Sequence, residues 1–178
     1  MKNLFFSVAL LTCIFLSFFK LNAQSLNDNR GYIVSIGDNV PNVMFSLMDG
    51  TEMTLSSLKG KVVVLQFTAS WCSVCRKEMP HLEKEVWLPN KDKDFVMIAV
   101  DIDKDSSKVK PFIDQMETSY PVAFDSDKSI FSKFAQPNAG VTRNIVIDKT
   151  GKIAFLTRLF DPIEFDEMKS EIAKCLNN

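Results

Sequence analysis

Residues 61–75 read KVVVLQFTASWCSVC, an apolar run that leads directly into two cysteines. The run does not alternate between polar and apolar residues, which is typical of a strand buried on both faces of a sheet. The residues that follow, 73–86, are polar and unbroken enough for a helix, apart from Pro80. This stretch therefore predicts a buried strand whose carboxyl end meets the start of a helix at Cys72.

The rest of the chain carries signals for further strands and helices. Residues 107–117 place apolar side chains at i, i+3, i+4 and i+7, the stripe of an amphipathic helix. Turn residues at 49–50 and 148–151 predict two hairpins. This order of elements predicts one α/β domain, a mixed central sheet with helices on both faces. The other expected elements are strands over 95–100, 144–147 and 153–157, a short helix near Phe131, and a last helix capped by Asp161 with Glu164 in a capping-box position.

The composition limits the class of protein. The 178 residues suffice for one sizeable core and are few for two domains. With 46% hydrophobic and 24% charged residues, collagen-like, low-complexity and wholly disordered chains are excluded. The 21 Lys and Arg nearly balance the 22 Asp and Glu, so there is no basic surplus for a phosphate backbone. We therefore expect no nucleic-acid partner.

The N-terminus has the features of a secretory signal peptide. Lys2 precedes an apolar run over 4–19, and Ala23 is a small residue at its exit. We expect cleavage after Ala23 and a periplasmic or secreted domain. Two alternatives remain: a retained membrane anchor facing the periplasm, although the run is short for a span of about 20 residues, and lipid attachment at Cys13. The expected segments are a signal peptide or membrane anchor over 1–23, a short leader over 24–36 and a domain over 37–178.

The two cysteines lie where a thiol would be reactive. Cys72 is expected at the N-terminus of the helix, where unpaired N–H groups and the helix dipole stabilise a thiolate. This environment lowers the pKa of a cysteine below its usual value of about 8.5. Cys75, one turn deeper, can reach Cys72 and is shielded from solvent. An exposed thiolate attacks a substrate disulfide, and a second cysteine then resolves the mixed disulfide.

Three other interpretations of the cysteine pair are weaker. A structural disulfide across so short a loop removes little entropy from the unfolded chain. A zinc site requires four ligands, and only His81 and Cys175 remain to supply the other two. The third interpretation is two unrelated core cysteines. Thiol–disulfide exchange without a metal is the favoured hypothesis.

The segment 71–75, WCSVC, after an apolar strand and with Pro80 in the following helix, resembles the thioredoxin superfamily. A longer match, from about Gly37 to the C-terminus, resembles its secreted or membrane-tethered TlpA/ResA-type branch. The features that match are Gly37, Pro41, Asp49-Gly50, Leu55, Leu58-Lys59-Gly60, Glu78-Met79-Pro80, Ile145-Val146-Ile147-Asp148 and Gly151-Lys152.

The resemblance implies a thioredoxin-like fold with an added N-terminal β-hairpin. It also implies a domain that exchanges two electrons with protein disulfides without a bound cofactor, as a reductase. In an oxidising compartment, reduction requires an external thiol electron donor, which we expect to be a carrier in the membrane.

Residue by residue, Cys72 matches the family's nucleophile and Cys75 its resolving thiol, with a redox-active disulfide between them. Glu78 matches an acid that, in ResA-type proteins, lies near the cysteine pair and tunes its protonation. A partly buried carboxyl group close to a dithiol has a raised pKa and can relay a proton. The alternative for Glu78 is an exposed helix residue beside Arg76. Trp71 is expected to shield the cysteines and to touch substrate.

One position departs from the family's pattern. Thioredoxin-like proteins usually carry a cis-proline that faces the cysteines, and the matching residue here is Thr142. A cis bond before a residue other than proline costs about 2.5–4 kcal/mol, so we expect a trans peptide. The loop is still expected to face the site, with Val141, Thr142 and Arg143 as candidate substrate-binding residues.

Two further hypotheses come from other classes of function. Thr142 and Arg143 favour a peroxiredoxin-like (AhpC/TSA-like) thiol peroxidase, in which an arginine stabilises the thiolate and polarises a peroxide. The hydroxyl that such enzymes carry three residues before the cysteine is missing, because Ala69 stands there. The other hypothesis is a thioredoxin-fold binding module, in which some of the 15 Phe and 8 Met form a partner groove.

Three remaining features are expected to be structural. The acidic residues within 101–105 resemble the start of a calcium loop, but Ser106 and Phe112 stand where such a loop needs Gly and Glu. We therefore expect a solvated loop after a strand. His81 is expected at the surface or in local packing, and Cys175 on the inward face of the last helix, where a cysteine acts as a small hydrophobe.

Overall fold

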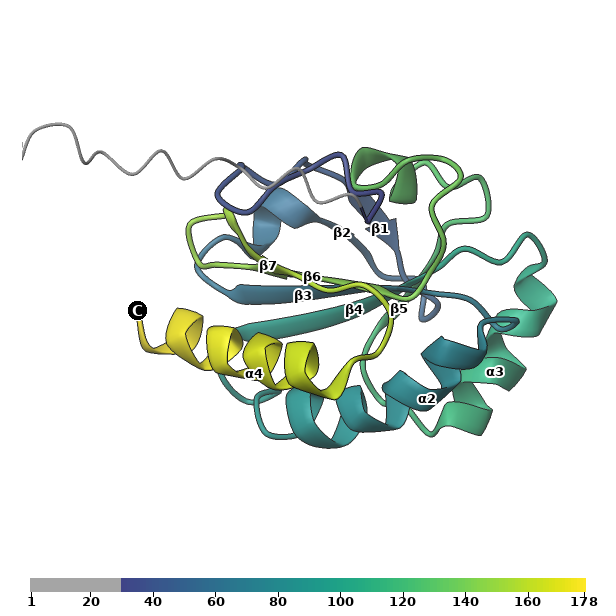
Figure 1. Cartoon of the computed structure of the whole chain (residues 1–178). Coiled ribbons are helices and arrows are strands. Elements are labelled where there is room, and N and C mark those ends of the chain that lie inside the picture. The colour runs from purple at the N-terminus through teal and green to yellow at the C-terminus, as the bar shows by residue number, and fades with distance from the viewer. Residues whose placement is uncertain (1–29) are drawn as a thin grey trace, which may run out of the picture.

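The structure of the protein is a computed structural model that describes residues 30–178 (Figure 1). The predicted signal peptide, its alternatives as a membrane anchor or a segment lipidated at Cys13, and the first part of the leader lie outside these residues. None of the helices within residues 30–178 has the length and apolar character that crossing a bilayer requires.

A mixed sheet of five strands forms the centre of the molecule, in the order β5-β4-β3-β6-β7. β3 pairs in parallel with β4, and β4 with β5, whereas β6 runs antiparallel to both β3 and β7. Every residue of β3 is buried, which explains its lack of alternation. The strands are β3 (Val62–Thr68), β4 (Phe95–Asp101), β5 (Val122–Phe124), β6 (Arg143–Ile147) and β7 (Ile153–Leu156).

The α-helices all cover one face of this sheet (Figure 1). Met79, Phe112 and Met168, one from each α-helix, belong to a single core cluster on that face. The helices are α2 (Ser73–His81), its π-helical continuation η2 (Leu82–Trp87), α3 (Val109–Met116), preceded by the 3₁₀ turn η3 (Ser106–Lys108), and α4 (Pro162–Asn177).

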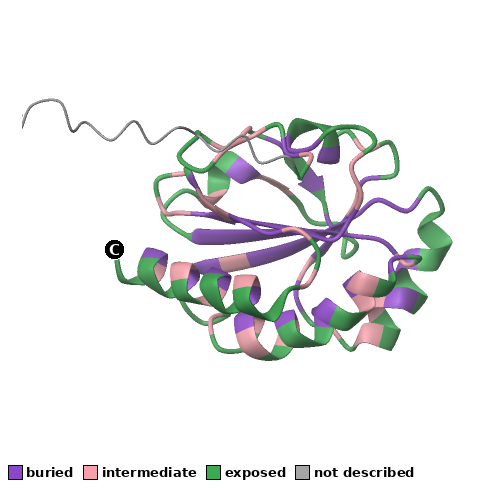
Figure 2. Ribbon diagram, in the orientation of Figure 1, coloured by how far each residue is buried: buried purple, intermediate pink, exposed green. Residues whose placement is uncertain are grey.

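The second face is covered by the N-terminal hairpin and two short 3₁₀ helices. Phe45 of the hairpin and Phe131 of η4 are fully buried there, and the Phe131 ring meets the edge of Phe67 with centroids 5.2 Å apart. Figure 2 shows the buried residues concentrated along the sheet and on the inward sides of these elements. The elements are β1 (Met44–Ser46), β2 (Glu52–Thr54), η1 (Leu55–Leu58) and η4 (Phe131–Lys133).

Helical segments lie on both faces, as expected, but the α-helices share one face. The strand order explains this, because the crossovers through α2 and α3 step across the sheet in the same direction, from β3 to β4 to β5. Right-handed crossovers that step in one direction place both helices on one face. The sequence pattern predicted the helices but not the strand order, so it could not assign the faces.

The helix predicted over 73–86 is confirmed, with a change of geometry after Pro80. Proline has no N–H to donate within a helix and disturbs the regular bonding around it. The chain remains helical, but from Leu82 it follows the wider π-helical pattern to Trp87.

Residues 30–32, which lie within the predicted leader, pack against the domain. Tyr32 is buried, and its hydroxyl donates to the carbonyl oxygens of Thr157, at 2.6 Å, and Asn144, at 3.2 Å. Arg30 forms an ion pair with Glu164 on α4. The N-terminal segment is thus fastened to the edge formed by β6, β7 and the start of α4.

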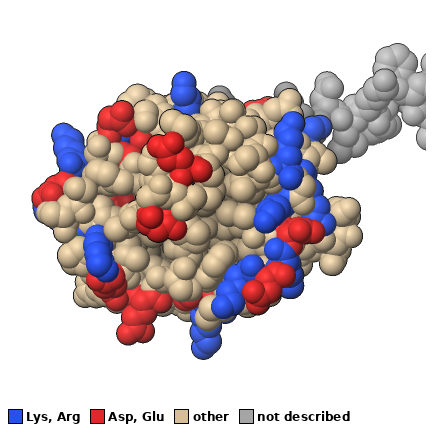
Figure 3. Space-filling model, turned by 180° about the vertical axis from the view of Figure 1, so that it is seen from behind, with Lys and Arg blue, Asp and Glu red and all other residues tan. Residues whose placement is uncertain are grey.

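Surface charge is mixed rather than gathered by sign. On the side opposite to Figure 1, basic and acidic side chains alternate along the margins, and the middle carries few charges (Figure 3). Charges of both signs also meet around α4, where Lys169 pairs with Asp166 of the same helix and with Glu85 of η2.

Candidate active site

The cysteine pair lies where β3 ends and α2 begins. Cys72 is the N-cap residue of α2, and its sulfur accepts a hydrogen bond from the Cys75 N–H at 3.0 Å. The two sulfurs form a disulfide, and their Cα atoms are 5.3 Å apart. Both cysteines are buried, whereas the preceding Trp71 is 65% exposed. A helix N-terminus that already donates to the first sulfur would favour its thiolate form.

The loop before Cys72 is held from two sides. The Ser70 N–H donates to a carboxylate oxygen of Asp103 at 2.8 Å. The Ser70 carbonyl oxygen accepts two hydrogen bonds from the guanidinium of Arg76, at 2.8 and 3.1 Å. That guanidinium also lies over the Phe112 ring of α3, 4.8 Å from its centroid. These contacts fix the path of the chain just ahead of the first sulfur.

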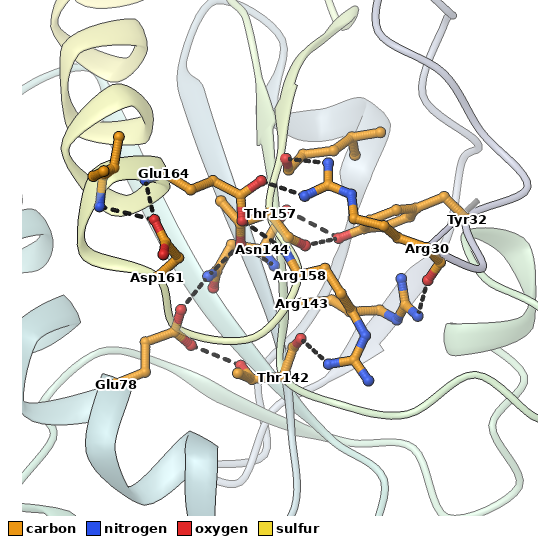
Figure 4. A network of polar contacts seen from close by, with 12 residues as sticks. Arg30, Tyr32, Glu78, Thr142, Arg143, Asn144, Thr157, Arg158, Asp161 and Glu164 are labelled. Atoms are coloured by element: carbon orange, nitrogen blue, oxygen red, sulfur yellow. Dashed lines mark hydrogen bonds and ion pairs between the residues drawn. The ribbon is translucent and has the colours of Figure 1, made fainter. Parts of the chain in front are cut away.

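Glu78 lies one turn after Cys75 and is 1% exposed. Three buried side chains donate to its carboxyl group. Thr142 Oγ1 donates to Oε2 at 2.7 Å, and Asn144 Nδ2 donates to Oε1 at 2.7 Å (Figure 4). Gln66 Nε2 donates to Oε2 at 3.3 Å. The alternative of an exposed helix residue is therefore excluded for Glu78.

Burial raises the pKa of Glu78 from 4.5 to about 7, although the three hydrogen bonds from Thr142, Asn144 and Gln66 oppose that rise. Removing a carboxylate from water disfavours its charged form, and donors aimed at its oxygens favour it. Near neutral pH, both protonation states of Glu78 are therefore populated. A group in that condition can accept and release a proton without a large driving force.

The loop that contains Val141 and Thr142 reaches this site. The Val141–Thr142 peptide is cis, so the prediction of a trans bond was wrong. That prediction used only the local preference of a peptide before a residue other than proline. It had no access to the contacts of Thr142, whose carbonyl oxygen accepts from the Leu159 N–H at 3.1 Å and from Arg158 Nη1 at 3.3 Å (Figure 4).

Arg143 lies next to Thr142 in the chain, but its side chain lies in the interior. It is 1% exposed, and its guanidinium lies 4.5 Å from the centroid of the Tyr32 ring. Nε donates to the carbonyl oxygen of Gly140 at 2.8 Å, and Nη2 donates to that of Arg30. The structure thus places this guanidinium in contacts that join the loop to the N-terminal segment, away from solvent.

Gln66, Asn144 and Thr157 are functional candidates that were not predicted from the sequence. All three are buried, and Asn144 Nδ2 bridges Glu78 and Thr157 Oγ1, the latter at 2.9 Å. One signal was available, because Gln66 is a polar residue inside an otherwise apolar strand. A buried polar side chain needs a partner, so its presence in β3 pointed to a polar group on a facing element.

The acidic residues within 101–105 were expected in a solvated loop, but two of the three are buried. These two are Asp101, the last residue of β4, which pairs with Thr68 of β3, and Asp103, which accepts the Ser70 N–H. Asp101 Oδ1 accepts the Asp103 N–H at 2.9 Å, and burial raises the pKa of Asp101 from 3.8 to about 7. Only Asp105, the N-cap of η3, is exposed.

The two remaining features lie where they were expected. His81 is exposed, with Nδ1 2.8 Å from Glu85 Oε1, and its ring stacks against Phe160 with centroids 5.0 Å apart. Cys175 is buried on the inward face of α4. Both residues are therefore engaged in local packing.

Known proteins are similar to this chain in sequence and in fold. The Redoxin family profile matches residues 35–174. Thiol-disulfide oxidoreductase ResA of Bacillus anthracis is 34% identical over 120 residues, which cover 67% of this chain and 68% of that protein. A candidate protein disulfide isomerase from Bacteroides thetaiotaomicron has 49% identity and a TM-score of 0.80, over 83% of this chain and 94% of that one. A candidate thiol:disulfide interchange protein DsbE from Chlorobium tepidum has 27% identity and a TM-score of 0.69, over 80% and 99%.

The fold, the cysteine pair at a helix N-terminus and these relatives define a class, the thiol–disulfide oxidoreductases of the thioredoxin superfamily. Within that class the chain belongs to the Redoxin family and is a ResA-like member. The resemblance stated from the sequence is therefore confirmed, as is the N-terminal hairpin added to the thioredoxin-like sheet.

Proposed function

We propose that this oxidoreductase reduces disulfide bonds in other polypeptides, with Cys72 as the nucleophile and Cys75 as the resolving thiol. The observation that carries the proposal is the position of Cys72 at the N-cap of α2, where its sulfur accepts the Cys75 N–H. That position favours the thiolate of the first cysteine. Cys75 has no exposed surface, which suits a thiol that reacts only within the protein.

The reaction then follows in two exchanges. In the reduced protein, the Cys72 thiolate attacks a substrate disulfide, and one substrate sulfur leaves as a thiolate. Cys75 next attacks the Cys72 sulfur, so that the internal disulfide forms and the second substrate sulfur leaves. Two electrons pass to the substrate, whose two thiolates take up protons. An external thiol donor must then reduce the internal disulfide again.

Glu78 is the group that we propose accepts the proton of Cys75 before the second exchange. It follows Cys75 by three residues, so the two side chains lie on neighbouring positions of one helix face. Its raised pKa of about 7 allows it to take that proton near neutral pH and later to give it up.

Substrate would meet the protein around Trp71, whose exposed ring lies directly before the nucleophile. The backbone of Val141 and Thr142 supplies the second contact in this proposal. We assign no substrate contact to the Arg143 side chain, because it is enclosed.

The proposal places the domain outside the cytoplasm, released by cleavage near Ala23 or held by residues 1–23. Its support is the pattern of a positive start, an apolar run and a small residue in that segment. The partners are protein disulfides and a thiol electron donor, for which a membrane carrier is the expected source. The peroxidase hypothesis gains no support from Arg143, because its guanidinium is bonded to backbone carbonyl groups and stacked on Tyr32.

The test is a trap for the mixed disulfide. In the full-length Cys75→Ser variant, the second exchange is blocked, so polypeptides should accumulate on Cys72 and be released by a reducing agent. The matched control is the double variant with Cys72→Ser and Cys75→Ser, which keeps Cys175. Mass spectrometry of the released polypeptides identifies the substrates.

Adducts on the single variant alone support the proposal. An absence of adducts, or equal amounts on the double variant, would refute the assignment of Cys72 as nucleophile. A binding module would keep its cellular role in the double variant, and a peroxidase would consume peroxide in the reduced wild type faster than free cysteine does.

A further inference from the structure

Behind Glu78 lies a hydrogen-bonded chain that the mechanism above does not use. The hydroxyl of Tyr120 donates to Oε1 of Gln66 at 2.9 Å, and Nε2 of Gln66 donates to Oε2 of Glu78 at 3.3 Å. All three side chains are buried. The residues come from three elements, the loop before β5, strand β3 and helix α2, so no segment of sequence reveals the chain.

The Gln66 amide could present either of its ends to Glu78. With the NH₂ group facing Glu78, it stabilises the carboxylate, whereas with the carbonyl oxygen facing Glu78 it would repel the carboxylate and accept from the protonated acid. A donor on the far side settles the choice. A hydroxyl that donates to Oε1 holds the amide with its NH₂ group toward Glu78 and polarises that group.

Tyr120 is suited to be that donor. Burial raises the pKa of Tyr120 well above 10, so its hydroxyl keeps its proton at every pH at which the protein works. Its ring is fixed among apolar neighbours, with the ring of Trp87 at a centroid distance of 6.5 Å. A rigid, permanently protonated hydroxyl therefore faces the amide oxygen.

We propose that Tyr120 is a positioning residue for the active-site acid: its hydroxyl, acting through the Gln66 amide, keeps a hydrogen-bond donor aimed at Glu78. This inference rests on the proposed function, in which Glu78 takes part in proton transfer. Tyr120 touches neither the sulfurs nor the substrate in that scheme, and it acts only through Gln66.

Other groups around Glu78 set the background against which this effect is measured. Thr142 and Asn144 donate to it from the loop and from β6. Glu164 on α4 raises the pKa of Glu78 by its negative charge. Arg158 bonds the Thr142 carbonyl oxygen, and the Cys72–Cys75 pair precedes Glu78 on α2. In the oxidised protein that pair does not titrate, so it adds no second proton to the measurement.

The experiment is a titration of the carboxyl group itself in the oxidised, full-length protein. Glutamate labelled with ¹³C separates the infrared bands of Glu from those of the buried Asp101, and the band missing from Glu78→Gln is assigned to Glu78. Tyr120→Phe removes one donor and keeps the ring. In this variant the midpoint of the Glu78 titration should rise by about half a pH unit or more. The Gln66 amide loses the hydrogen bond from Tyr120 that keeps its NH₂ group toward the carboxylate, so the carboxylate is less favoured.

The matched control uses the other tyrosine, since the chain contains only two. Tyr32→Phe also removes a buried hydroxyl, but that hydroxyl donates to backbone carbonyl groups of Asn144 and Thr157. It should leave the midpoint of Glu78 unchanged. In this Tyr32→Phe protein, Tyr120 is the sole tyrosine, so biosynthetic replacement by 3-fluorotyrosine makes its hydroxyl a stronger donor, while burial still favours its protonated form. The midpoint of Glu78 should then fall.

Opposite shifts in these two proteins support the inference. An unchanged midpoint in Tyr120→Phe overturns it, as does an equal shift in Tyr32→Phe. If Tyr120→Phe does not fold, the fluorinated protein alone decides, because an unchanged or raised midpoint there contradicts the proposed donor. A separate measurement tests the proposed function of Glu78. If that function is wrong, Glu78→Gln leaves the pH profile of disulfide exchange unaltered, whatever the titration gives.

Discussion

Glu78 shows how one side chain can be held between two protonation states. Its surroundings remove it from water, which favours the acid, and supply three hydrogen-bond donors, which favour the carboxylate. Burial outweighs the three donors, and the pKa of Glu78 rises from 4.5 to about 7. Since the donors come from Thr142, Asn144 and Gln66, any change in the loop or the sheet that moves one donor should change the ionisation of this acid.

The second buried acid, Asp101, gives a prediction for stability. Its pKa is about 7 in the folded protein against 3.8 for the free side chain. Below pH 3.8 both states carry the proton, so this carboxyl group adds no pH dependence there. Between these two values the unfolded chain loses the proton while the folded protein keeps it, so the free energy of unfolding falls as pH rises, by at most on the order of 4 kcal/mol above pH 7.

We therefore expect Asp101→Asn to lose less stability than the wild type between about pH 5 and pH 8. The amide keeps an oxygen for the Asp103 N–H and has no proton to lose. Urea unfolding of the oxidised protein at both pH values measures the difference. Glu78 contributes a dependence of the same sign, so a smaller decline should persist in the variant. The same decline in both proteins would contradict the assignment of a raised pKa to Asp101.

At the scale of single residues, the sequence located the sulfur pair and its acid but not the partners of that acid. Cys72, Cys75 and Glu78 follow one another along one helix, so their spacing alone relates them. Asn144 and Tyr120 come from distant parts of the chain, and only the folded sheet brings them to Glu78 and Gln66. Contacts of that kind depend on tertiary structure, which no local pattern encodes.

Among the elements, α4 has a start that the sequence predicted and the structure refines. Asp161 accepts hydrogen bonds from the Ile163 and Glu164 N–H groups, at 2.9 and 3.0 Å, so the predicted cap is confirmed. Glu164 does not complete a capping box. Its carboxylate accepts the Arg158 N–H instead and pairs with Arg30, because these partners from outside the helix are available in the folded molecule.

We expect Asp161→Ala to lower the free energy of unfolding by about 1 kcal/mol, the usual contribution of an N-cap side chain. Asp161→Asn is the matched control, because its amide oxygen can still accept the two N–H groups. Urea titration of both variants measures the loss. Equal destabilisation by Ala and Asn would show that the negative charge, and not the cap, supplies the stability. The active site lies outside this contact, so exchange activity at low urea should not change.

The strand and helix around the cysteines were predictable for a different reason. β3 is apolar throughout most of its length because both of its faces are covered. The helix after it has Cys72 as its N-cap, polar residues on its exposed side and Met79 on its buried side. The π-helical turns after Pro80 and the cis peptide before Thr142 were not predictable. Each of them departs from a local preference, and sequence reasoning follows local preferences.

Over the whole molecule, the sheet separates two cores of different construction. On one face, three α-helices bury apolar side chains such as Met79, Phe112 and Met168, and on the other a short hairpin and 3₁₀ helices bury Phe45, Leu55 and Phe131. Cys72 and Cys75 belong to the second core, together with Phe45 and Phe67. The hairpin therefore belongs to the same core as the two cysteines, and is not only an appendage to the sheet.

This arrangement predicts a large effect for Phe45→Ala. The ring is fully buried, so its removal should lower the free energy of unfolding by about 3–5 kcal/mol. Met44→Ala, at the neighbouring, 59% exposed position of the same strand, should change it by less than about 0.5 kcal/mol. Equilibrium unfolding of the two oxidised variants tests the pair. Comparable losses, or a small loss for Phe45→Ala, would mean that the hairpin contributes little to this core.

The attachment of Arg30 and Tyr32 has a mechanical consequence. Arg30 is bonded to Glu164 and to the carbonyl oxygen of Leu156, and Tyr32 to the carbonyl oxygens of Asn144 and Thr157, so both hold the edge made by β6, β7 and the start of α4. Tension applied to the chain ahead of Arg30 would load that edge first and the hairpin last. A molecule pulled by its N-terminus would thus give way first beside its last strand, while the hairpin stayed folded.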